Sequence, residues 1–141
     1  MEQLSEAPRG AGLILIADDT SDTRELYSLY LTHQGFAVVT ADDGHAAIEM
    51  ARQHQPDLIV MDLSMPRVDG VAATNRLKRD ARTRRIPVIV LTAHPLKQNQ
   101  QRAQEAGAAL FLTKPCLPEE LEQHVRRLLG GVTAPQRKSA D

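Results

Sequence analysis

Five short, unbroken apolar runs alternate along the 141-residue chain with longer segments in which apolar positions recur at helical spacing. Strands that read as continuous apolar runs are buried on both faces, as in a parallel sheet covered by helices on each side. The pattern therefore predicts an α/β fold in which a strand–helix unit is repeated five times. The predicted strands are 13–17, 36–39, 58–61, 88–91 and 109–112.

Residues that favour helix ends mark several of the segments between the strands. Asp22, with Glu25 three residues later, is expected to open the first helix as a capping pair, and Gly35 to close it. Asp43 is expected to cap the second helix, and Pro118 to stand in the first turn of the fifth. That last helix should bury one apolar stripe, formed by Leu121, Val125 and Leu128.

The two ends of the chain differ in composition from the segment between them. Residues 1–12 and 131–141 are rich in Gly, Pro, Ser and charge, so we expect mobile tails around one domain at 13–130. The formal net charge of −1 gives no general attraction to nucleic acid or anionic membranes. No apolar stretch approaches the roughly 20 residues of a membrane span, and the first residues lack signal-peptide features. We therefore expect a cytoplasmic protein, in which the single Cys116 is a packing residue.

Three carboxylates follow two of the predicted strands. Asp18 and Asp19 come directly after the first apolar run, and Asp62 follows the third. In an open parallel sheet, ligands bind outside the carboxyl ends of the strands, so these side chains should share one crevice. Like charges at close range raise one another's pKa unless protons or a cation intervene. Oxygen ligands of this kind suit Mg²⁺, which is the predicted cofactor.

The remaining strands place two more polar groups in the same crevice. Thr92 follows the fourth strand, and Lys114 comes just after the fifth. Three acids, a hydroxyl and an ammonium group together favour phosphoryl transfer, with Asp62 as the nucleophile and Asp18 and Asp19 holding Mg²⁺. Lys114 would bind one phosphoryl oxygen and Thr92 another. Taken singly, each has an ordinary explanation: a turn and helix cap, a strand-end hydroxyl and a surface charge. The combination favours function.

Several strings of the sequence resemble the receiver domain of two-component response regulators, from Leu13 to about Leu129. By this resemblance the fold is a flavodoxin-like, doubly wound (βα)5 three-layer sandwich with a parallel sheet of order 2-1-3-4-5. The strings, in order, are Ala17-Asp18-Asp19, residues 56–66, Asp69-Gly70, Leu91-Thr92-Ala93 and Ala106-Gly107-Ala108 leading to Lys114-Pro115.

The resemblance also implies roles for individual residues. Asp62 would accept a phosphoryl group from a histidine kinase or a histidine phosphotransfer protein, and Ser64 would give its backbone carbonyl to Mg²⁺. Phe111 would be the aromatic side chain that turns inward in the active state together with Thr92. Ser64 and His94 match positions that tune the lifetime of the phosphoryl group. The bond between Lys114 and Pro115 is expected to be cis.

Three classes of function fit the acidic residues. We favour a phosphorylatable signalling module that catalyses only its own phosphorylation and dephosphorylation and acts on a downstream protein, as a monomer or a weak phosphorylation-dependent dimer. An aspartyl-phosphate phosphatase usually needs a second Asp two residues after the nucleophile, where this chain has Ser64. A DNA-binding regulator needs a further helical segment, so a lone receiver is expected, with a fragment of a hybrid histidine kinase or longer regulator as the alternative. The basic run 78–85 lacks aromatic residues for base stacking and is expected to span the end of the third helix and the loop after it.

Two helices carry unusual apolar patterns. The first has more apolar residues than one buried stripe needs, and the family's spacing directs Leu26 and Leu29 outward and Tyr27, Tyr30 and Leu31 inward. Leu26 is therefore a candidate docking residue for the phosphodonor. The fourth helix, 96–106, has few large apolar side chains, so we expect it to move on activation.

Overall fold

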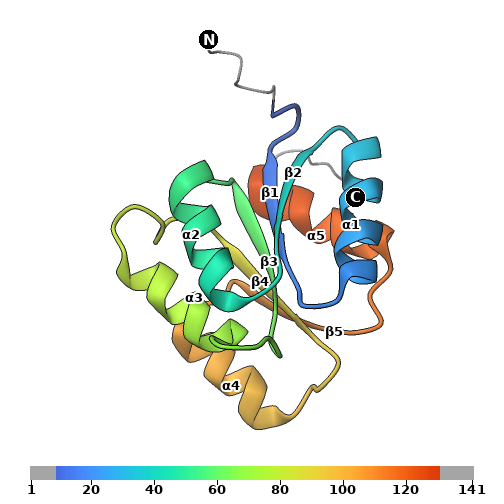
Figure 1. Ribbon diagram of the computed structural model, residues 1–141. Helices are drawn as coiled ribbons and strands as arrows, with labels where there is room; N and C mark the ends of the chain where they lie inside the picture. The colour runs from blue at the N-terminus through green and yellow to red at the C-terminus, as the bar shows by residue number, and fades with distance from the viewer. Residues whose placement is uncertain (1–8, 131–141) are drawn as a thin grey trace.

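Strands and helices alternate strictly in the computed structural model, which describes residues 9–130 (Figure 1). All strand pairs are parallel, and the sheet order is β2-β1-β3-β4-β5, as predicted. The elements are β1 (Leu13–Ala17), α1 (Ser21–His33), β2 (Ala37–Ala41), α2 (Gly44–His54), β3 (Leu58–Asp62), α3 (Gly70–Arg79), β4 (Val88–Thr92), α4 (Lys97–Ala106), β5 (Leu110–Thr113) and α5 (Pro118–Gly130).

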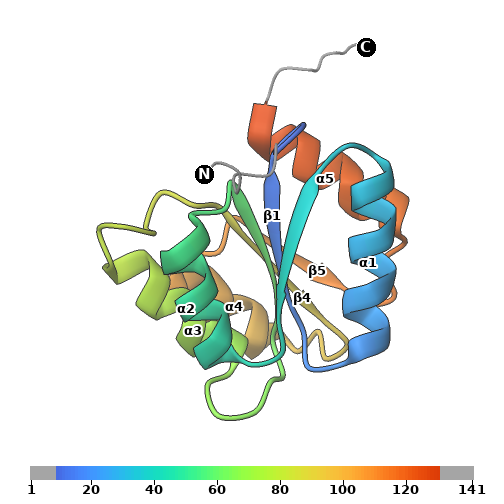
Figure 2. The same cartoon turned by 45° about the horizontal axis from the view of Figure 1, so that its top comes forward.

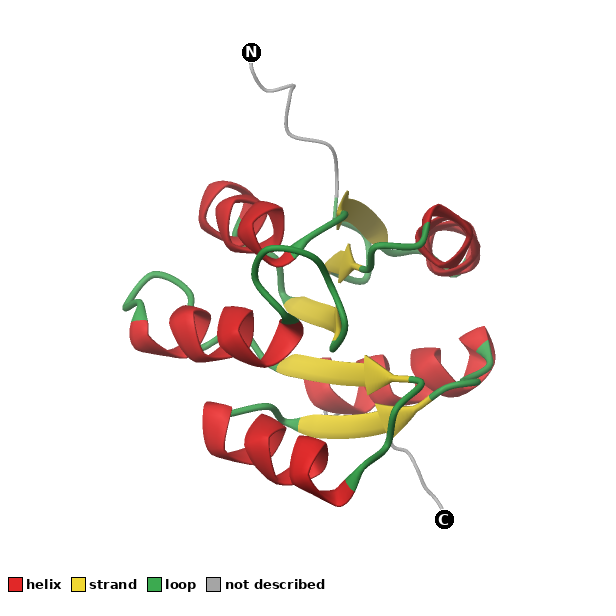
Figure 3. Ribbon diagram, turned by 60° about the horizontal axis from the view of Figure 1, so that its bottom comes forward, coloured by secondary structure: helices red, strands yellow, loops and turns green. Residues whose placement is uncertain are grey.

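Helices cover both faces of the sheet, which explains the unbroken apolar strands. Helices α1 and α5 lie on one face, and α2, α3 and α4 lie on the other (Figures 2 and 3). Successive residues of a strand point to opposite faces, so Leu15 packs under α2 and α3 while Ile14 and Ile16 pack under α1 and α5. The three-layer sandwich predicted from the sequence is confirmed.

Several element boundaries differ from the prediction by one or two residues, and two of these differences have a clear physical reason. Strand β2 begins at Ala37 because the backbone of Phe36 pairs with Gly10 in an isolated antiparallel bridge, while the Phe36 side chain is buried. The capping pair predicted at Asp22 and Glu25 is wrong. Helix α1 begins at Ser21, and Asp22 lies inside its first turn.

The other predicted helix ends are confirmed. The side chain of Asp43 accepts a hydrogen bond from the backbone N–H of Ala46 at 2.7 Å, which caps α2. Helix α1 ends just before Gly35, and Pro118 is the first residue of α5. The predicted stripe of α5 is present, since Leu121 and Val125 are fully buried and Leu128 packs beside them.

Residues 9–12, part of the predicted N-terminal tail, contact the domain. The Arg9 guanidinium donates to the backbone carbonyls of His54 and Gln55, both at 3.0 Å, at the end of α2. Because a cation is favourable at a helix C-terminus, these contacts hold the segment against α2. The rest of the two predicted tails, 1–8 and 131–141, lies outside the described residues.

Helices α1 and α4 have the predicted faces. Tyr27 and Leu31 are buried, Tyr30 is half-buried, and Leu26 and Leu29 are 54% and 68% exposed. Ala103 is the one buried side chain among the residues of α4. Helix α4 is therefore the helix with the smallest apolar anchor on the sheet.

The basic run 78–85 is engaged mainly in local structure. The Lys78 ammonium donates to the carbonyls of Arg84 and Ile86, and Asp80 pairs with Arg82 and Arg52. These bonds close the loop between α3 and β4, as expected for cations at the end of a helix. Among residues 9–130, no helix is both long and apolar enough to cross a membrane.

Candidate functional site

The central strands β1 and β3 are neighbours, and their carboxyl ends bring the three predicted acids together. Asp18 follows β1 and Asp62 is the last residue of β3; both are buried, while Asp19 is exposed. One carboxylate oxygen from each residue lies within 4.8 Å of the others. The cluster forms because β1 and β3 are adjacent in the sheet and parallel, so their carboxyl ends lie side by side at one edge.

Lys114 bridges the two buried acids. Its Nζ lies 3.0 Å from Oδ2 of Asp18 and 3.3 Å from Oδ1 of Asp62. The backbone N–H of Lys114 donates to the carbonyl of Thr92 at 2.8 Å, which extends the pairing of β4 with β5 to the site. The bond between Lys114 and Pro115 is cis, as predicted.

The pKa values of Asp62 and Lys114 are set by burial and by neighbouring charges. Burial, together with the neighbouring Asp18 charge, raises the pKa of Asp62 from its ordinary value to about 6, although Lys114 acts in the opposite direction. Burial pulls the pKa of Lys114 down, but its contacts with Asp18 and Asp62 outweigh that effect and leave the pKa raised. Lys114 is therefore charged at neutral pH, whereas the Asp62 carboxyl titrates close to it.

Asp18 is held by its own neighbours in the chain. Its Oδ1 accepts the backbone N–H of Thr20 at 2.9 Å, and its carbonyl accepts the Arg24 guanidinium at 2.7 Å. Its backbone N–H donates to the carbonyl of Ala41, the last residue of β2, at 3.0 Å. Sequence reasoning missed Arg24, because a lone arginine in the first turns of a helix carries no signal of such a contact.

The predicted switch residues lie on β4 and β5. Thr92 is fully buried, and its Oγ1 accepts the backbone N–H of His94 at 2.9 Å. Phe111 is half-buried on β5 and packs against the apolar cluster under α2, α3 and α4. The proposed movement of these two side chains on activation stays a prediction.

The loop between β3 and α3 closes tightly around Asp62. The backbone N–H of Gly70 donates to the carbonyl of Leu63 at 2.8 Å, and a Cβ at Gly70 would collide with the carbonyl of Asp62. Only glycine allows this approach. Ser64, in the same loop, is exposed beside the acidic cluster.

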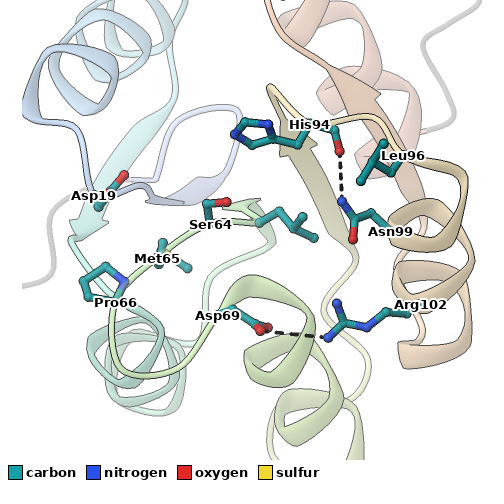
Figure 4. A pocket seen from close by; sticks show the side chains of 10 residues that line it. Asp19, Ser64, Met65, Pro66, Asp69, His94, Leu96, Asn99 and Arg102 are labelled. Atoms are coloured by element: carbon teal, nitrogen blue, oxygen red, sulfur yellow. Dashed lines mark hydrogen bonds and ion pairs between the residues drawn. The ribbon is translucent and has the colours of Figure 1, made fainter.

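A cleft of about 710 Å³ opens from the acidic cluster toward α4 (Figure 4). Asp19, Ser64 and His94 lie on its rim, and Asn99 and Arg102 of α4 line the other side. The Asn99 amide donates to the carbonyl of His94 at 3.0 Å, and Arg102 lies 3.9 Å from Asp69. Asn99 and Arg102 could not be predicted as residues of this cleft, because polar side chains on an exposed helix are ordinary.

The donor set fits a hard divalent cation. Three carboxylate oxygens converge, one from an exposed residue and two from buried ones, and carboxylates are the ligands that Mg²⁺ prefers in proteins. The Lys114 ammonium group contacts two of these carboxylates and offsets one of the three negative charges. A bound cation would therefore relieve the repulsion that remains.

Comparisons with known proteins agree with this geometry. The family model of the response regulator receiver domain matches residues 14–126. The DNA-binding dual master transcriptional regulator RpaA of Synechocystis sp. is 44% identical over 82% of this chain, and the chain spans about half, 48%, of RpaA. The polar-differentiation response regulator DivK of Brucella anthropi is 31% identical over 83% of this chain and 95% of DivK.

A solved structure has the same fold. The receiver domain of sensor histidine kinase PA1611 from Pseudomonas aeruginosa is 30% identical, with a TM-score of 0.78 over 84% of this chain and 98% of that domain. A magnesium ion is coordinated in its active site cleft.

Proposed function

The chain belongs to the response regulator receiver family of two-component signalling, and we propose that Asp62 is its phosphoacceptor. The observation that carries this proposal is the buried Asp62 carboxylate between the acids of β1 and the Lys114 ammonium group. A nucleophile with a cation 3.3 Å from its oxygen has a charged partner ready for an incoming phosphoryl group.

The transfer that we propose moves a phosphoryl group from a phosphohistidine. A carboxylate oxygen of Asp62 forms a bond to phosphorus as the bond between phosphorus and the donor imidazole nitrogen breaks, and that electron pair stays on the nitrogen. Lys114 would then bind one phosphoryl oxygen, and Thr92 would leave its bond with the His94 N–H to donate its hydroxyl to another. Ser64 and His94, on the rim of the cleft, would influence how quickly water reaches the acyl phosphate.

Asp18, Asp19, Asp62 and the backbone carbonyl of Ser64 would hold Mg²⁺. When bound, the ion neutralises negative charge on the carboxylates and on the phosphoryl group. The converging carboxylates of this chain and the magnesium in the PA1611 receiver domain support this assignment. Without the ion, Lys114 alone compensates Asp18 and Asp62.

The partners follow from this chemistry. The donor is a histidine kinase or a histidine phosphotransfer protein, and Leu26, 54% exposed on α1, is the proposed docking residue. The protein has no other substrate in this proposal, so it catalyses only its own phosphorylation and dephosphorylation. Its output is a change in contacts with a downstream protein through α4, β5 and α5.

Labelling with acetyl phosphate tests the proposal directly. The wild-type protein should be labelled only with Mg²⁺, and Asp62→Asn should abolish the label. Lys114→Ala should retain Mg²⁺ binding but lose the conformational response to phosphorylation, whereas Arg85→Ala, a change in the exposed α3–β4 loop, should behave as wild type. Undiminished labelling of Asp62→Asn would refute the assignment of the phosphoacceptor, and loss of Mg²⁺ affinity in Lys114→Ala would refute the role of the lysine.

Leu26→Ala tests the docking face separately. It should slow phosphotransfer from the kinase but leave labelling by acetyl phosphate unchanged, because the small donor needs no protein interface. Leu29→Ala, on the same helix and 68% exposed, is the matched control. If both variants slow transfer equally, Leu26 has no special part in docking.

A further inference from the structure

The loop from Leu63 to Asp69 stands between the phosphoacceptor and the start of α2. The contacts of Gly70 with the backbone carbonyls of Asp62 and Leu63 fix the end of this loop to the end of β3. Leu63 and Met65 anchor it in the apolar core, whereas Pro66 and Arg67 are exposed. The position of Ser64 therefore depends on the contacts that hold the exposed part of this loop, residues 66–68.

Arg67, in this exposed part of the loop, has an unfavourable backbone conformation. Its φ is +65°, and the backbone N–H of Val68 donates to the carbonyl of Pro66 at 2.8 Å, so Arg67 is the centre of a three-residue γ-turn. A residue with a Cβ disfavours positive φ, and such conformations persist only where the surroundings hold them. Glycine or asparagine would be the ordinary choice here, so the arginine side chain has another reason to be present.

The start of α2 supplies the holding contacts. Nη1 of Arg67 lies 2.6 Å from Oδ2 of Asp43, whose other oxygen accepts the N–H of Ala46. The Ala46 bond, and after it the Arg67 charge, keep the pKa of Asp43 below its ordinary value, so the carboxylate is charged at neutral pH. A Cβ at Gly44 would collide with the carbonyl of Val68, so loop and helix also meet backbone to backbone.

The same helix start connects to the other side of the acidic cluster. Asp43 lies two residues after Ala41, whose carbonyl accepts the backbone N–H of Asp18. The Arg67–Asp43 pair thus joins the loop that carries Ser64 to the strand end that fixes Asp18. One ion pair thereby connects the loop that carries Ser64 with the strand end that carries Asp18, and both residues are proposed Mg²⁺ ligands.

We propose that the Arg67–Asp43 ion pair positions the Ser64 carbonyl relative to the carboxylates of Asp18 and Asp62, so that the site binds Mg²⁺ with the loop already in place. The inference rests on the proposed function for the identity of the ligands. Arg67 is 69% exposed at its side chain, and ion pairs of this kind contribute little to global stability. Its effect should therefore appear in Mg²⁺ affinity rather than in unfolding.

Calorimetric titration of the metal-free protein with MgCl₂ tests this on four variants. Arg67→Ala and Asp43→Asn should each weaken Mg²⁺ binding about tenfold, the lower end of the effect of groups outside the ligand shell. Asn is as good a helix cap as Asp, so the second variant removes the charge and retains the cap. The double variant should be no weaker than either single one, since both remove the same contact. Arg67→Lys should restore most of the affinity.

Two further measurements separate positioning from general damage. Amide exchange at Val68 and Gly70 in the metal-free protein should accelerate in Arg67→Ala, because their N–H groups bond within the loop. The urea midpoint should stay close to that of wild type, and Arg85→Ala, an exposed arginine of the α3–β4 loop, should change none of the three properties.

Each outcome bears on the proposal. Unchanged Mg²⁺ affinity in the Arg67 and Asp43 variants overturns it, as do additive losses in the double variant or an equal loss in Arg85→Ala. Failure of the proposed function is visible separately, because the wild-type protein would then bind no Mg²⁺ and Asp62→Asn would remain labelled by acetyl phosphate.

Discussion

At the scale of single residues, the charged Asp62 carboxylate is in an unfavourable position, because it is desolvated by burial and repelled by Asp18. Its carboxylate is buried next to Asp18, and one lysine at 3.3 Å does not cancel both effects. The result is a pKa of about 6, raised from the ordinary 3.8. A nucleophile in this state destabilises the metal-free fold, since the folded protein binds the proton more tightly than the unfolded chain.

This predicts a pH-dependent gain in stability for Asp62→Asn. The pKa of Asp62 is higher in the folded protein than in the unfolded chain, so its proton stabilises the fold. This stabilisation is fully present below about pH 4 and is lost as the pH rises through about 6. At about 1.4 kcal/mol per pKa unit, the metal-free variant should exceed wild type by up to about 3 kcal/mol at pH 7. The gain should shrink toward zero near pH 4.

Urea unfolding of both proteins in EDTA, followed by circular dichroism across this pH range, measures the difference. Groups that titrate identically in both proteins cancel. A difference that is the same at every pH, or that grows as the pH falls, would contradict the raised pKa of Asp62.

The residues of the acidic cluster could be predicted from sequence, and those that hold it could not. Asp18, Asp62, Thr92 and Lys114 follow directly from the rule that parallel strands present their carboxyl ends at one edge. The pairing of Arg67 with Asp43 depends instead on a loop conformation with positive φ, for which an arginine gives no signal. Local sequence thus reveals the chemistry better than it reveals the contacts that orient it.

At the scale of elements, α4 differs from the other helices in how it is attached. It buries one small side chain, Ala103, with the partly buried Ala106 packed on the same core. Polar contacts at its first turns add to this, such as Asn99 to the His94 carbonyl and Arg102 beside Asp69. Helix α5 instead buries Leu121 and Val125 completely. Exposed hydrogen bonds can be replaced by hydrogen bonds to water at little cost in free energy, so α4 should open more readily than α5.

Hydrogen exchange with and without beryllofluoride tests this prediction. In the unmodified protein, the amides of 97–106 should exchange faster than those of 118–130. Beryllofluoride with Mg²⁺, as a phosphoryl mimic, should change protection across 94–111, because His94 links Thr92 to α4 through its N–H and carbonyl. A change confined to α1 would show that α4 is not part of the output surface.

Element boundaries show where sequence patterns lose information. The strands β1, β3 and β4 were predictable because burial on both faces leaves unbroken apolar runs, and the half-buried edge strands β2 and β5 retain shorter ones. The start of β2 was not, because Phe36 is as buried as a strand residue but pairs with Gly10 instead of β1. Likewise, Asp22 and Glu25 have the spacing of a capping pair, yet the chain already turns into the helix at Ser21.

At the scale of the whole molecule, the acidic cluster is coupled to the centre of the sheet. Asp18 and Asp62 end β1 and β3, which are adjacent in the order β2-β1-β3-β4-β5 and fully buried between two helical layers. Opening the cluster therefore requires the central strands to separate. A ligand that binds only the closed cluster should stabilise the entire domain rather than one loop.

Mg²⁺ should accordingly raise the thermal midpoint in proportion to the logarithm of its concentration above the dissociation constant. At a free concentration ten times that constant, the expected gain is about 1.4 kcal/mol, or a few degrees for a domain of this size. Scanning calorimetry of wild type in increasing MgCl₂ measures this, with matched KCl to separate general screening from binding. Asp18→Asn should remove most of the dependence, whereas Asp57→Asn, an exposed carboxylate at the opposite ends of the strands, should keep it. An equal response in both variants would mean that the stabilisation is a general salt effect and that the cluster does not bind the ion.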